Sequence, residues 1–191
     1  YPLWGLALED MDNDGDLDVP LAGGQIMDPV PVATNPSVVP NFLYIREDGG
    51  FVDKAPEWGF DKVENHRGLV VTDMNNDGYL DLLLRDINGH PFVGYSRCGA
   101  ENWVKIQLTQ PGNNHYAIGA RVDVTAGEKS LVRWVTAGST SFASSVAPEV
   151  HFGLDTEDLV DVKVTWPDGM VSVVEGVSAN QTISAERLKR P

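Results

Sequence analysis

The chain has 191 residues, of which 42% are hydrophobic, and a formal net charge of −14 at pH 7. This size allows a sizeable buried core in one or two domains. The acidic balance argues against nucleic acids and anionic membrane surfaces as partners, because their phosphates require basic residues. No apolar run reaches the roughly 18 residues of a membrane span, and the single cysteine, Cys98, excludes an internal disulfide bond.

The first predicted element is an acidic loop at residues 10–18, with the sequence DMDNDGDLD. Oxygen-bearing side chains stand at alternate positions, and Gly15 allows a tight turn. Ca²⁺ binds six to eight oxygen atoms at about 2.3–2.6 Å. We therefore predict a calcium site formed by the side chains of Asp10, Asp12, Asp14 and Asp18 and the backbone carbonyl of Asp16. A solvated acidic turn is the alternative, because Asp, Asn and Gly are also common turn residues.

Short apolar segments flank this loop. Leu6 and Leu8 precede it, and Val19 and Leu21 follow it, without helical spacing. This pattern predicts a strand, a calcium loop and a second strand. An EF-hand is excluded, because its bidentate acid at loop position 12 would fall on Leu21.

The next segments predict a loop and a hairpin. Residues 25–40 are rich in Pro and Val and lack periodicity, which favours an extended loop. Phe42 and Tyr44 then alternate with other residues before a DGG turn at 48–50, and Phe51 resumes the pattern, which indicates a β-hairpin. Residues 1–60 form a first predicted unit.

A second acidic loop, DMNNDGYLD, occupies residues 73–81 and begins 63 residues after the first. Apolar segments at 69–71 and 82–84 flank it. We predict a second calcium site there, formed by the side chains of Asp73, Asn75, Asp77 and Asp81 and the backbone carbonyl of Tyr79. Residues 61–99 thus repeat the plan of residues 1–60.

A repeat of this size, made of four short strands, is typical of a propeller blade. Two blades cannot close a ring, which takes four to eight. We therefore expect an incomplete propeller whose open edge is covered by other polypeptide. The chain begins at Tyr1 and not at methionine, so we also expect an upstream segment.

Residues 100–191 contain no further acidic loop and predict a small antiparallel β-sandwich or barrel. Residues 185–189 have weak helical character. The predicted strands are Trp103–Leu108, Ile118–Thr125, Ser130–Thr136, Val150–Leu154, Val160–Trp166, Met170–Glu175 and Thr182–Ala185. The predicted fold class is all-β, with two calcium-loop propeller-type blades followed by this small domain.

Catalytic motifs are missing from the sequence. It contains no HExxH, GxSxG or phosphate-binding loop. His151 is interpreted as a structural residue, and the paired carboxylates are assigned to calcium. The histidines, without metal-binding spacing, are His66, His90, His115 and His151. Four tryptophans are expected in the core and between blades: Trp4, Trp58, Trp103 and Trp134.

The two acidic loops, with their trailing hairpins, resemble the calcium-binding repeats of integrin-type propellers, known as FG-GAP or VCBS repeats. The literal FG and GAP signatures are absent, so the likeness is to the bacterial VCBS form. The resemblance implies the same eight side-chain ligands. It covers residues 1–99, about half of the chain.

The second half resembles the ASPIC/UnbV family. The residues that carry this resemblance are NNHYAIGARVDVTAG at 113–127, HFGLD at 151–155 and the segment with WPDG at 160–183. Domains of this family follow VCBS-type propellers in relatives of the cartilage acidic protein family, including many exported bacterial proteins. The resemblance implies an ASPIC/UnbV-like β domain at residues 100–191, without an established catalytic residue.

These expectations combine into one functional hypothesis. The chain is expected to be a non-catalytic, calcium-binding interaction or scaffold module of bacterial origin, located in the periplasm, at the cell surface or outside the cell. Its expected partners are other proteins, either subunits of a larger assembly or the upstream propeller blades. A carbohydrate-binding or adhesion domain is the first alternative, and a hydrolase-associated domain is the second.

Overall fold

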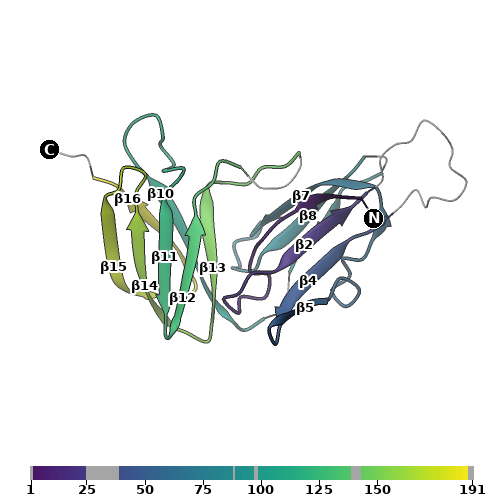
Figure 1. Cartoon of the computed structure of the whole chain (residues 1–191), viewed down its shortest axis with the longest axis horizontal. Helices are drawn as coiled ribbons and strands as arrows, with labels where there is room; N and C mark the ends of the chain where they lie inside the picture. Colours follow the sequence, from purple (N-terminus) through teal and green to yellow (C-terminus); the bar gives the residue numbers. More distant parts are fainter. Residues whose placement is uncertain (1, 25–38, 88, 97–98, 139–142, 189–191) are drawn as a thin grey trace, which may run out of the picture.

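The computed structural model describes residues 2–24, 39–87, 89–96, 99–138 and 143–188. These residues form sixteen β-strands in five sheets and no helix, so the prediction of an all-β fold is confirmed. Two sets of sheets lie side by side along the long axis of the molecule, β1–β9 in one set and β10–β16 in the other (Figure 1). Cys98 and most of the predicted extended loop, residues 25–38, lie outside the described residues.

The first acidic loop connects two antiparallel strands, as predicted. They belong to a four-stranded sheet with the order β1-β2-β4-β5. The DGG turn joins β4 to β5, with Asp48 and Gly49 at positive φ. The strands are β1 (Leu3–Leu6), β2 (Val19–Gly23), β4 (Phe42–Glu47) and β5 (Gly50–Asp53).

The second acidic loop also connects antiparallel strands, but its sheet has three strands within the described residues, in the order β7-β8-β9. The expected four-stranded sheet is therefore wrong for the second repeat. The described part of residues 61–99 contains four strands, but the first of them, the two-residue strand β6 (Val63–Glu64), pairs with β3 (Val39–Pro40) and does not join β7-β8-β9. The strands are β7 (His66–Thr72), β8 (Asp81–Asp86) and β9 (Phe92–Gly94).

The two N-terminal sheets share one hydrophobic core, and β1 and β2 contact β7. Leu43 and Leu84 are fully buried in it. Met11 and Leu80 belong to the same core, and they come from the two acidic loops. Each loop is thus anchored by one apolar side chain, while its first acidic residue, Asp10 or Asp73, bonds to the other set of sheets.

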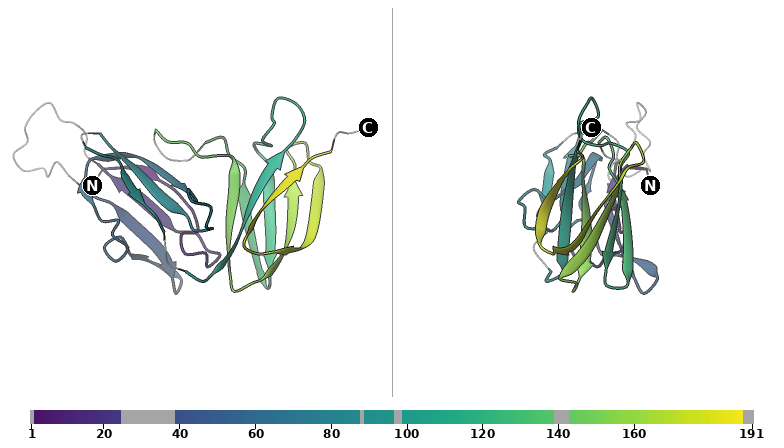
Figure 2. Two further views of the ribbon diagram at one scale, coloured as in Figure 1. Left: turned by 180° about the vertical axis from the view of Figure 1, so that it is seen from behind. Right: turned by 90° about the vertical axis from the view of Figure 1, so that its left-hand side faces the viewer.

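The C-terminal strands form a sandwich of two sheets, in the orders β13-β10-β16 and β12-β11-β14-β15 (Figure 2). Val160, Val162 and Val164 alternate with exposed or half-buried residues, as predicted for a strand with one buried face. They pack with Val104 and Phe152 of the opposite sheet. The strands are β10 (Asn102–Thr109), β11 (Arg121–Ala126), β12 (Lys129–Trp134), β13 (Glu149–Asp155), β14 (Leu159–Thr165), β15 (Val171–Ser178) and β16 (Gln181–Glu186).

Two expectations for this region are wrong. The sandwich is not wholly antiparallel, because β16 pairs in parallel with β10. Residues Ala185 and Glu186, in the segment with weak helical character, belong to β16, because their partners on β10 are Leu108 and Thr109. Pairing with a buried strand therefore overrides the local preference of this segment.

The tryptophans divide between the core and the surface. Trp103 is buried, as expected, and Trp4 is half-buried beneath Arg67, whose guanidinium carbon lies 4.4 Å from the indole centroid. The expectation of burial is wrong for Trp58 and Trp134, which are 44% and 58% exposed. Trp134 ends the edge strand β12, where no further strand covers its side chain. None of the described segments forms a helix long and apolar enough to cross a membrane.

Candidate metal centre between the two sets of sheets

The first acidic loop gathers three of its predicted ligands. One carboxylate oxygen from each of Asp10, Asp12 and Asp18 lies within 4.8 Å of the others. Asp10 and Asp18 are each only 1% exposed. Oδ1 of Asp10 and Oδ1 of Asp12 are buried without a hydrogen-bond partner. Buried polar atoms normally have a partner, so these two oxygens are candidates for binding a cation.

Backbone hydrogen bonds fix the shape of this loop. The amide of Gly15 donates to Asp10 Oδ2 at 3.0 Å, and the amide of Met11 donates to Asp18 Oδ2 at 2.7 Å. Asp14 Oδ1 accepts from the amide of Asp16 at 2.8 Å. Asp14 and Asp16 therefore support the turn, and neither belongs to the group of three converging carboxylates.

Burial changes the acidity of the gathered carboxyls. Burial, followed by the charge of Asp14, raises the pKa of Asp10 to about 7. Burial likewise raises the pKa of Asp12 to about 6 and that of Asp18 to about 7. Without a cation, these groups therefore retain protons close to neutral pH.

The second acidic loop repeats the same hydrogen-bond pattern. The amide of Gly78 donates to Asp73 Oδ2 at 3.1 Å, and the amide of Met74 donates to Asp81 Oδ2 at 2.8 Å. The amide of Tyr79 donates to Asp77 Oδ1 at 3.0 Å. These bonds correspond to those of the first loop, 63 residues earlier.

A lysine distinguishes the second loop from the first. Lys105 Nζ, from β10, lies 3.0 Å from Asp73 Oδ2, and both side chains are buried. Asn75 Nδ2 donates to Asp77 Oδ2 at 2.8 Å. Asn75 stands where the first loop has Asp12, so the three positions that gather in the first loop carry two carboxylates and one amide in the second. The second loop thus has a cation supplied by the protein itself.

Asn13 connects both loops to the C-terminal sheets. Its Nδ2 donates to the carbonyl oxygen of Gly78 at 3.0 Å, so its Oδ1 faces His151 Nε2, 2.7 Å away. Its carbonyl oxygen accepts from the amide of Asp155 at 2.8 Å. Because Asn13 Oδ1 is an acceptor, His151 carries its proton on Nε2. Burial, followed by the charge of Lys105, lowers the pKa of His151 to about 3, so the ring is neutral.

Glycine permits the close approach of the loops to the C-terminal sheets. A Cβ on Gly153 would lie 2.3 Å from Asn13 Cα, and one on Gly78 would lie 1.8 Å from Trp103 Nε1. The amide of Gly153 also donates to Asp10 Oδ2 at 3.1 Å. The HFGLD segment on β13 therefore holds the first acidic loop through His151, Gly153 and Asp155. Its role is structural in this geometry, in agreement with the interpretation of His151.

Sequence reasoning missed these contacts. Asn13 reads as an ordinary turn residue, and Lys105 reads as a polar residue in a strand. The one available signal was the HFGLD motif, whose small central glycine and adjacent histidine are typical of close packing. The partner of that motif could not be inferred, because His151 and Asn13 are 138 residues apart.

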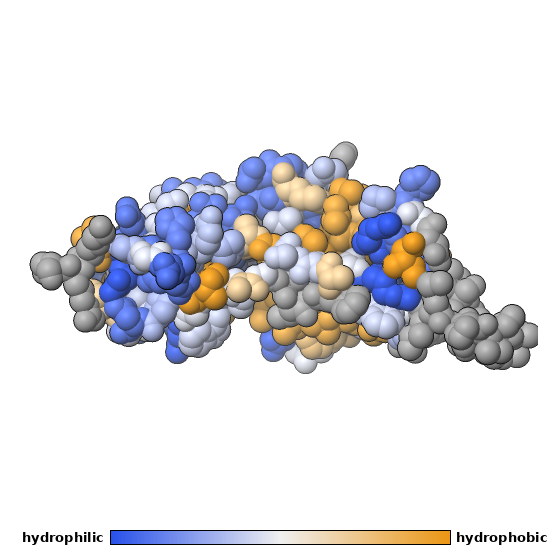
Figure 3. Space-filling model, turned by 90° about the horizontal axis from the view of Figure 1, so that it is seen from above, coloured by the Kyte–Doolittle hydropathy of each residue, from blue (hydrophilic) through white to orange (hydrophobic). Residues whose placement is uncertain are grey.

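A cavity of about 290 Å³ lies beside this contact, between β7 and β12–β13. Apolar side chains line much of it, together with Glu9, Arg133 and Trp134. Burial raises the pKa of Glu9 to about 7, although the charge of Arg133 opposes this shift. Figure 3 shows hydrophobic residues near the middle of the face seen from above.

Comparison with known proteins finds a family match for part of the chain. Residues 110–190 match the ASPIC and UnbV family model. This region contains β11–β16, including the HFGLD segment that holds the first acidic loop.

The chain is also similar to cartilage acidic protein 1. It is 31% identical to the protein of Mus musculus over 110 residues, 30% identical to that of Xenopus tropicalis over 116, and 31% identical to that of Homo sapiens over 110. The alignments cover 55%, 57% and 55% of this chain, and 17%, 18% and 16% of the relatives. The chain thus spans less than a fifth of the length of the curated relatives it matches.

Proposed function

We propose that the chain is a non-catalytic, calcium-binding interaction module in which an ion in the first loop strengthens the contact between the two sets of sheets. The observation that carries this proposal is the convergence of Asp10, Asp12 and Asp18, with buried oxygens that lack partners. All three donors are carboxylates, which suits the hard Ca²⁺ ion. Asp10 also accepts from Gly153 on β13, so an ion there would act on both sides of the contact.

The second loop is the weaker site in this proposal. Asp73, Asn75, Asp77 and Asp81, with the carbonyl of Tyr79, would supply its oxygen ligands. Lys105 already neutralises Asp73, and its charge would repel a divalent ion about 3 Å from that carboxylate. Calcium is therefore expected to fill the first loop before the second.

The proposed location is extracytoplasmic, where calcium is abundant, and the proposed partners are other proteins. We interpret the two N-terminal sheets as VCBS-type blades of an incomplete propeller. Exposed apolar residues on its outer strands support a covering partner: Phe51 and Val52 lie on β5, and Val93 lies on β9, each more than 40% exposed. Propeller blades from the same assembly or another subunit would cover them.

Calcium titration of the purified chain tests the proposal. A ligand that binds only the folded state stabilises it by about 2.7 kcal/mol at 100 times its dissociation constant. Calcium should therefore raise the melting temperature of chelator-treated protein, and calorimetry should resolve two unequal sites. Asp12→Asn should weaken the tighter site and reduce the shift.

Glu175→Gln is the matched control, because it removes one negative charge from exposed strand β15. This variant should keep the full shift. An unchanged melting temperature with calcium, or equal shifts in Asp12→Asn and Glu175→Gln, would contradict the proposal.

A carbohydrate-binding function is the second candidate, favoured by exposed Trp134 at the cavity between the sheets. Binding on a glycan array with calcium present, lost in Trp134→Ala, would support it. A hydrolase is the third candidate, and Glu9 is the residue to test, since its raised pKa of about 7 suits a proton donor. Turnover that disappears in Glu9→Gln would favour the hydrolase over a binding module.

A further inference from the structure

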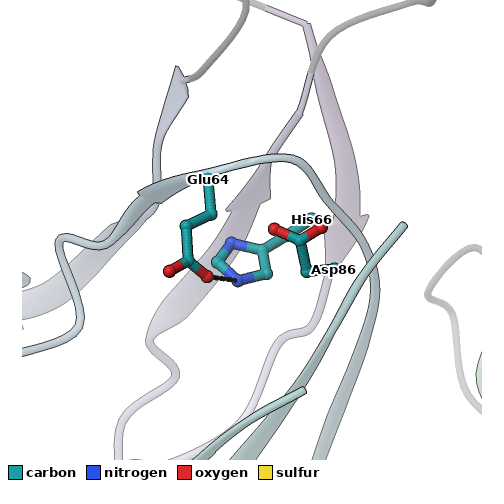
Figure 4. A group of neighbouring side chains, drawn as sticks. All are labelled: Glu64, His66 and Asp86. Carbon is teal, nitrogen blue, oxygen red and sulfur yellow. Dashed lines mark ion pairs between the residues drawn. The ribbon is translucent and has the colours of Figure 1, made fainter. Parts of the chain in front are cut away.

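A second cluster of metal-binding side chains lies in the N-terminal sheets, away from the acidic loops. Glu64 ends β6, His66 begins β7, and Asp86 ends β8 (Figure 4). One ligand atom from each lies within 4.8 Å of the others. The sequence shows no metal-binding spacing around the histidines, and strand pairing is what brings these three side chains together.

Strand geometry explains the cluster. His66 and Asp86 are direct partners in the antiparallel β7–β8 pair, so their side chains share one face of the sheet. Glu64 stands two residues before His66, which returns it to the same side in extended chain. The β7–β8 register shifts between His66 and Gly68, and such irregularities are common beside functional sites.

The hydrogen bonds of Asn41 determine which nitrogen of His66 carries the proton. Asn41 Nδ2 donates to the carbonyl oxygen of Phe60 at 3.0 Å, and its Oδ1 accepts from the amide of Gly23 at 3.0 Å. The same Oδ1 lies 3.0 Å from His66 Nδ1. An acceptor at this position requires Nδ1–H, so Nε2 of the neutral ring carries the lone pair.

That lone pair faces carboxylate oxygens. His66 is 0% exposed, and its Nε2 lies 3.2 Å from Glu64 Oε2, a contact that is an ion pair only when the ring is protonated (Figure 4). Burial lowers the pKa of His66, although Glu64 and Asp86 oppose the shift. A neutral imidazole nitrogen and carboxylates repel each other unless a cation lies between them.

The remaining contacts orient Asp86 for the same role. Its Oδ2 accepts from the amide of Asn65 at 3.1 Å, and its Oδ1 accepts from the amide of Gly89 at 2.6 Å. Each carboxylate oxygen can accept more than one bond. The guanidinium of Arg67 adds positive charge near Asp86 but makes no hydrogen bond to His66 Nε2.

We propose that Glu64, His66 and Asp86 bind a divalent transition-metal ion, with Zn²⁺ as the best fit. Imidazole nitrogen with carboxylate oxygen suits zinc, whereas calcium takes oxygen ligands. A ligating histidine commonly donates its other N–H to a carbonyl or carboxylate oxygen, as His66 does to Asn41. The side chain of Glu64 is 47% exposed, which leaves a path for the ion. The bound metal would join β6, β7 and β8.

Zinc titration of the intact chain tests this site. Chelator-treated protein is titrated with ZnCl₂ in the presence of saturating calcium, which occupies oxygen-only sites but does not replace zinc at an imidazole nitrogen. The expected result is one zinc per chain, with Co²⁺ substitution giving the visible absorption of a four-coordinate site. Glu64→Gln should weaken zinc binding at least about tenfold and abolish the cobalt spectrum.

Glu64→Gln is chosen because the side chain is half exposed, so the variant should fold with the wild-type melting temperature in the absence of metal. Glu175→Gln, which removes an equal charge elsewhere, should bind zinc like the wild type. No stoichiometric zinc binding, or equal zinc affinity in both variants, would overturn the proposal. Neither result would affect the calcium titration, which reports on the first acidic loop.

Discussion

Asn13 is the residue on which the contact between the two sets of sheets depends most directly. It binds His151 and the carbonyl of Gly78 through its side chain, and the amide of Asp155 through its own carbonyl. It is fully buried and has a φ of 61°. Removing its side chain would leave His151 Nε2 and the Gly78 carbonyl buried without partners.

We expect Asn13→Gly to lower the free energy of unfolding by about 2–4 kcal/mol, because each buried group without a partner costs about 1–3 kcal/mol. Glycine tolerates the positive φ, so the change isolates the side chain. Chemical denaturation with calcium present measures the loss.

Asn76→Gly is the matched control for this prediction. Asn76 holds the same position in the second loop, with a φ of 59°, but it is exposed. Its replacement should lower the free energy of unfolding by less than about 1 kcal/mol, which is the cost of the greater chain flexibility of glycine. Equal losses in the two variants would show that Asn13 acts through the loop conformation alone.

The sequence predicts those parts of the fold that depend on residues close together in the chain. Alternating acids with a glycine, between apolar segments, locate both loops and their flanking strands. The pairing of Lys105 with Asp73, 32 residues earlier in the chain, is a contact that no local pattern predicts. The Glu64–His66–Asp86 cluster depends on strand register, and no local pattern encodes the pairing of His66 with Asp86.

At the scale of the element, β13 is the strand that holds the first loop. Val150, Phe152 and Leu154 belong to the core of the sandwich, while His151 and Gly153, on the opposite side, meet the loop. Strand alternation thus gives one short segment two functions. The family match at residues 110–190 includes this strand, although the loop that it holds lies outside the match.

We expect Gly153→Ala to separate the first loop from β13. A Cβ there would lie 2.3 Å from Asn13 Cα, and backbone cannot move aside as a flexible side chain can. The loss of the Gly153–Asp10 hydrogen bond should weaken calcium binding about tenfold or more, since partners that orient ligands contribute 10–100-fold. Calorimetric titration with calcium measures this change.

Gly50→Ala on β5 provides the comparison, because a Cβ there would lie 3.8 Å from the nearest atom. Its calcium affinity should equal that of the wild type. If Gly153→Ala also bound calcium normally, the ion would act on the loop alone and not on the contact with β13.

At the scale of the whole molecule, charge and pH control stability together. A carboxyl whose folded-state pKa is raised stabilises the protein below its unfolded-state pKa, and this contribution is lost as the pH rises through the folded-state pKa. For Asp10 these values are 3.8 and about 7. His151 and His66, whose pKa values are lowered, act in the opposite direction, and mainly below pH 7.

We therefore expect the buried carboxyls to lower the stability of the calcium-free protein mainly between about pH 4 and pH 7, the window between their unfolded-state and folded-state pKa values, as they ionise without a partner. Calcium should remove this loss, because it binds the ionised form. The shift in melting temperature caused by calcium should consequently grow across this range. Thermal unfolding with and without calcium at each pH measures the shift, and a constant shift would contradict the assignment.

The Lys105–Asp73 pair makes the two halves of the contact between the sets of sheets differ in their need for a bound cation. The half that contains the second loop carries its own counter-charge and can assemble in a compartment that is poor in calcium. In the proposed function, the half that contains the first loop reaches its full charge balance only with a bound ion. Under that proposal, the contact would be looser on the side of the first loop in surroundings poor in calcium, and calcium would make both sides equally firm.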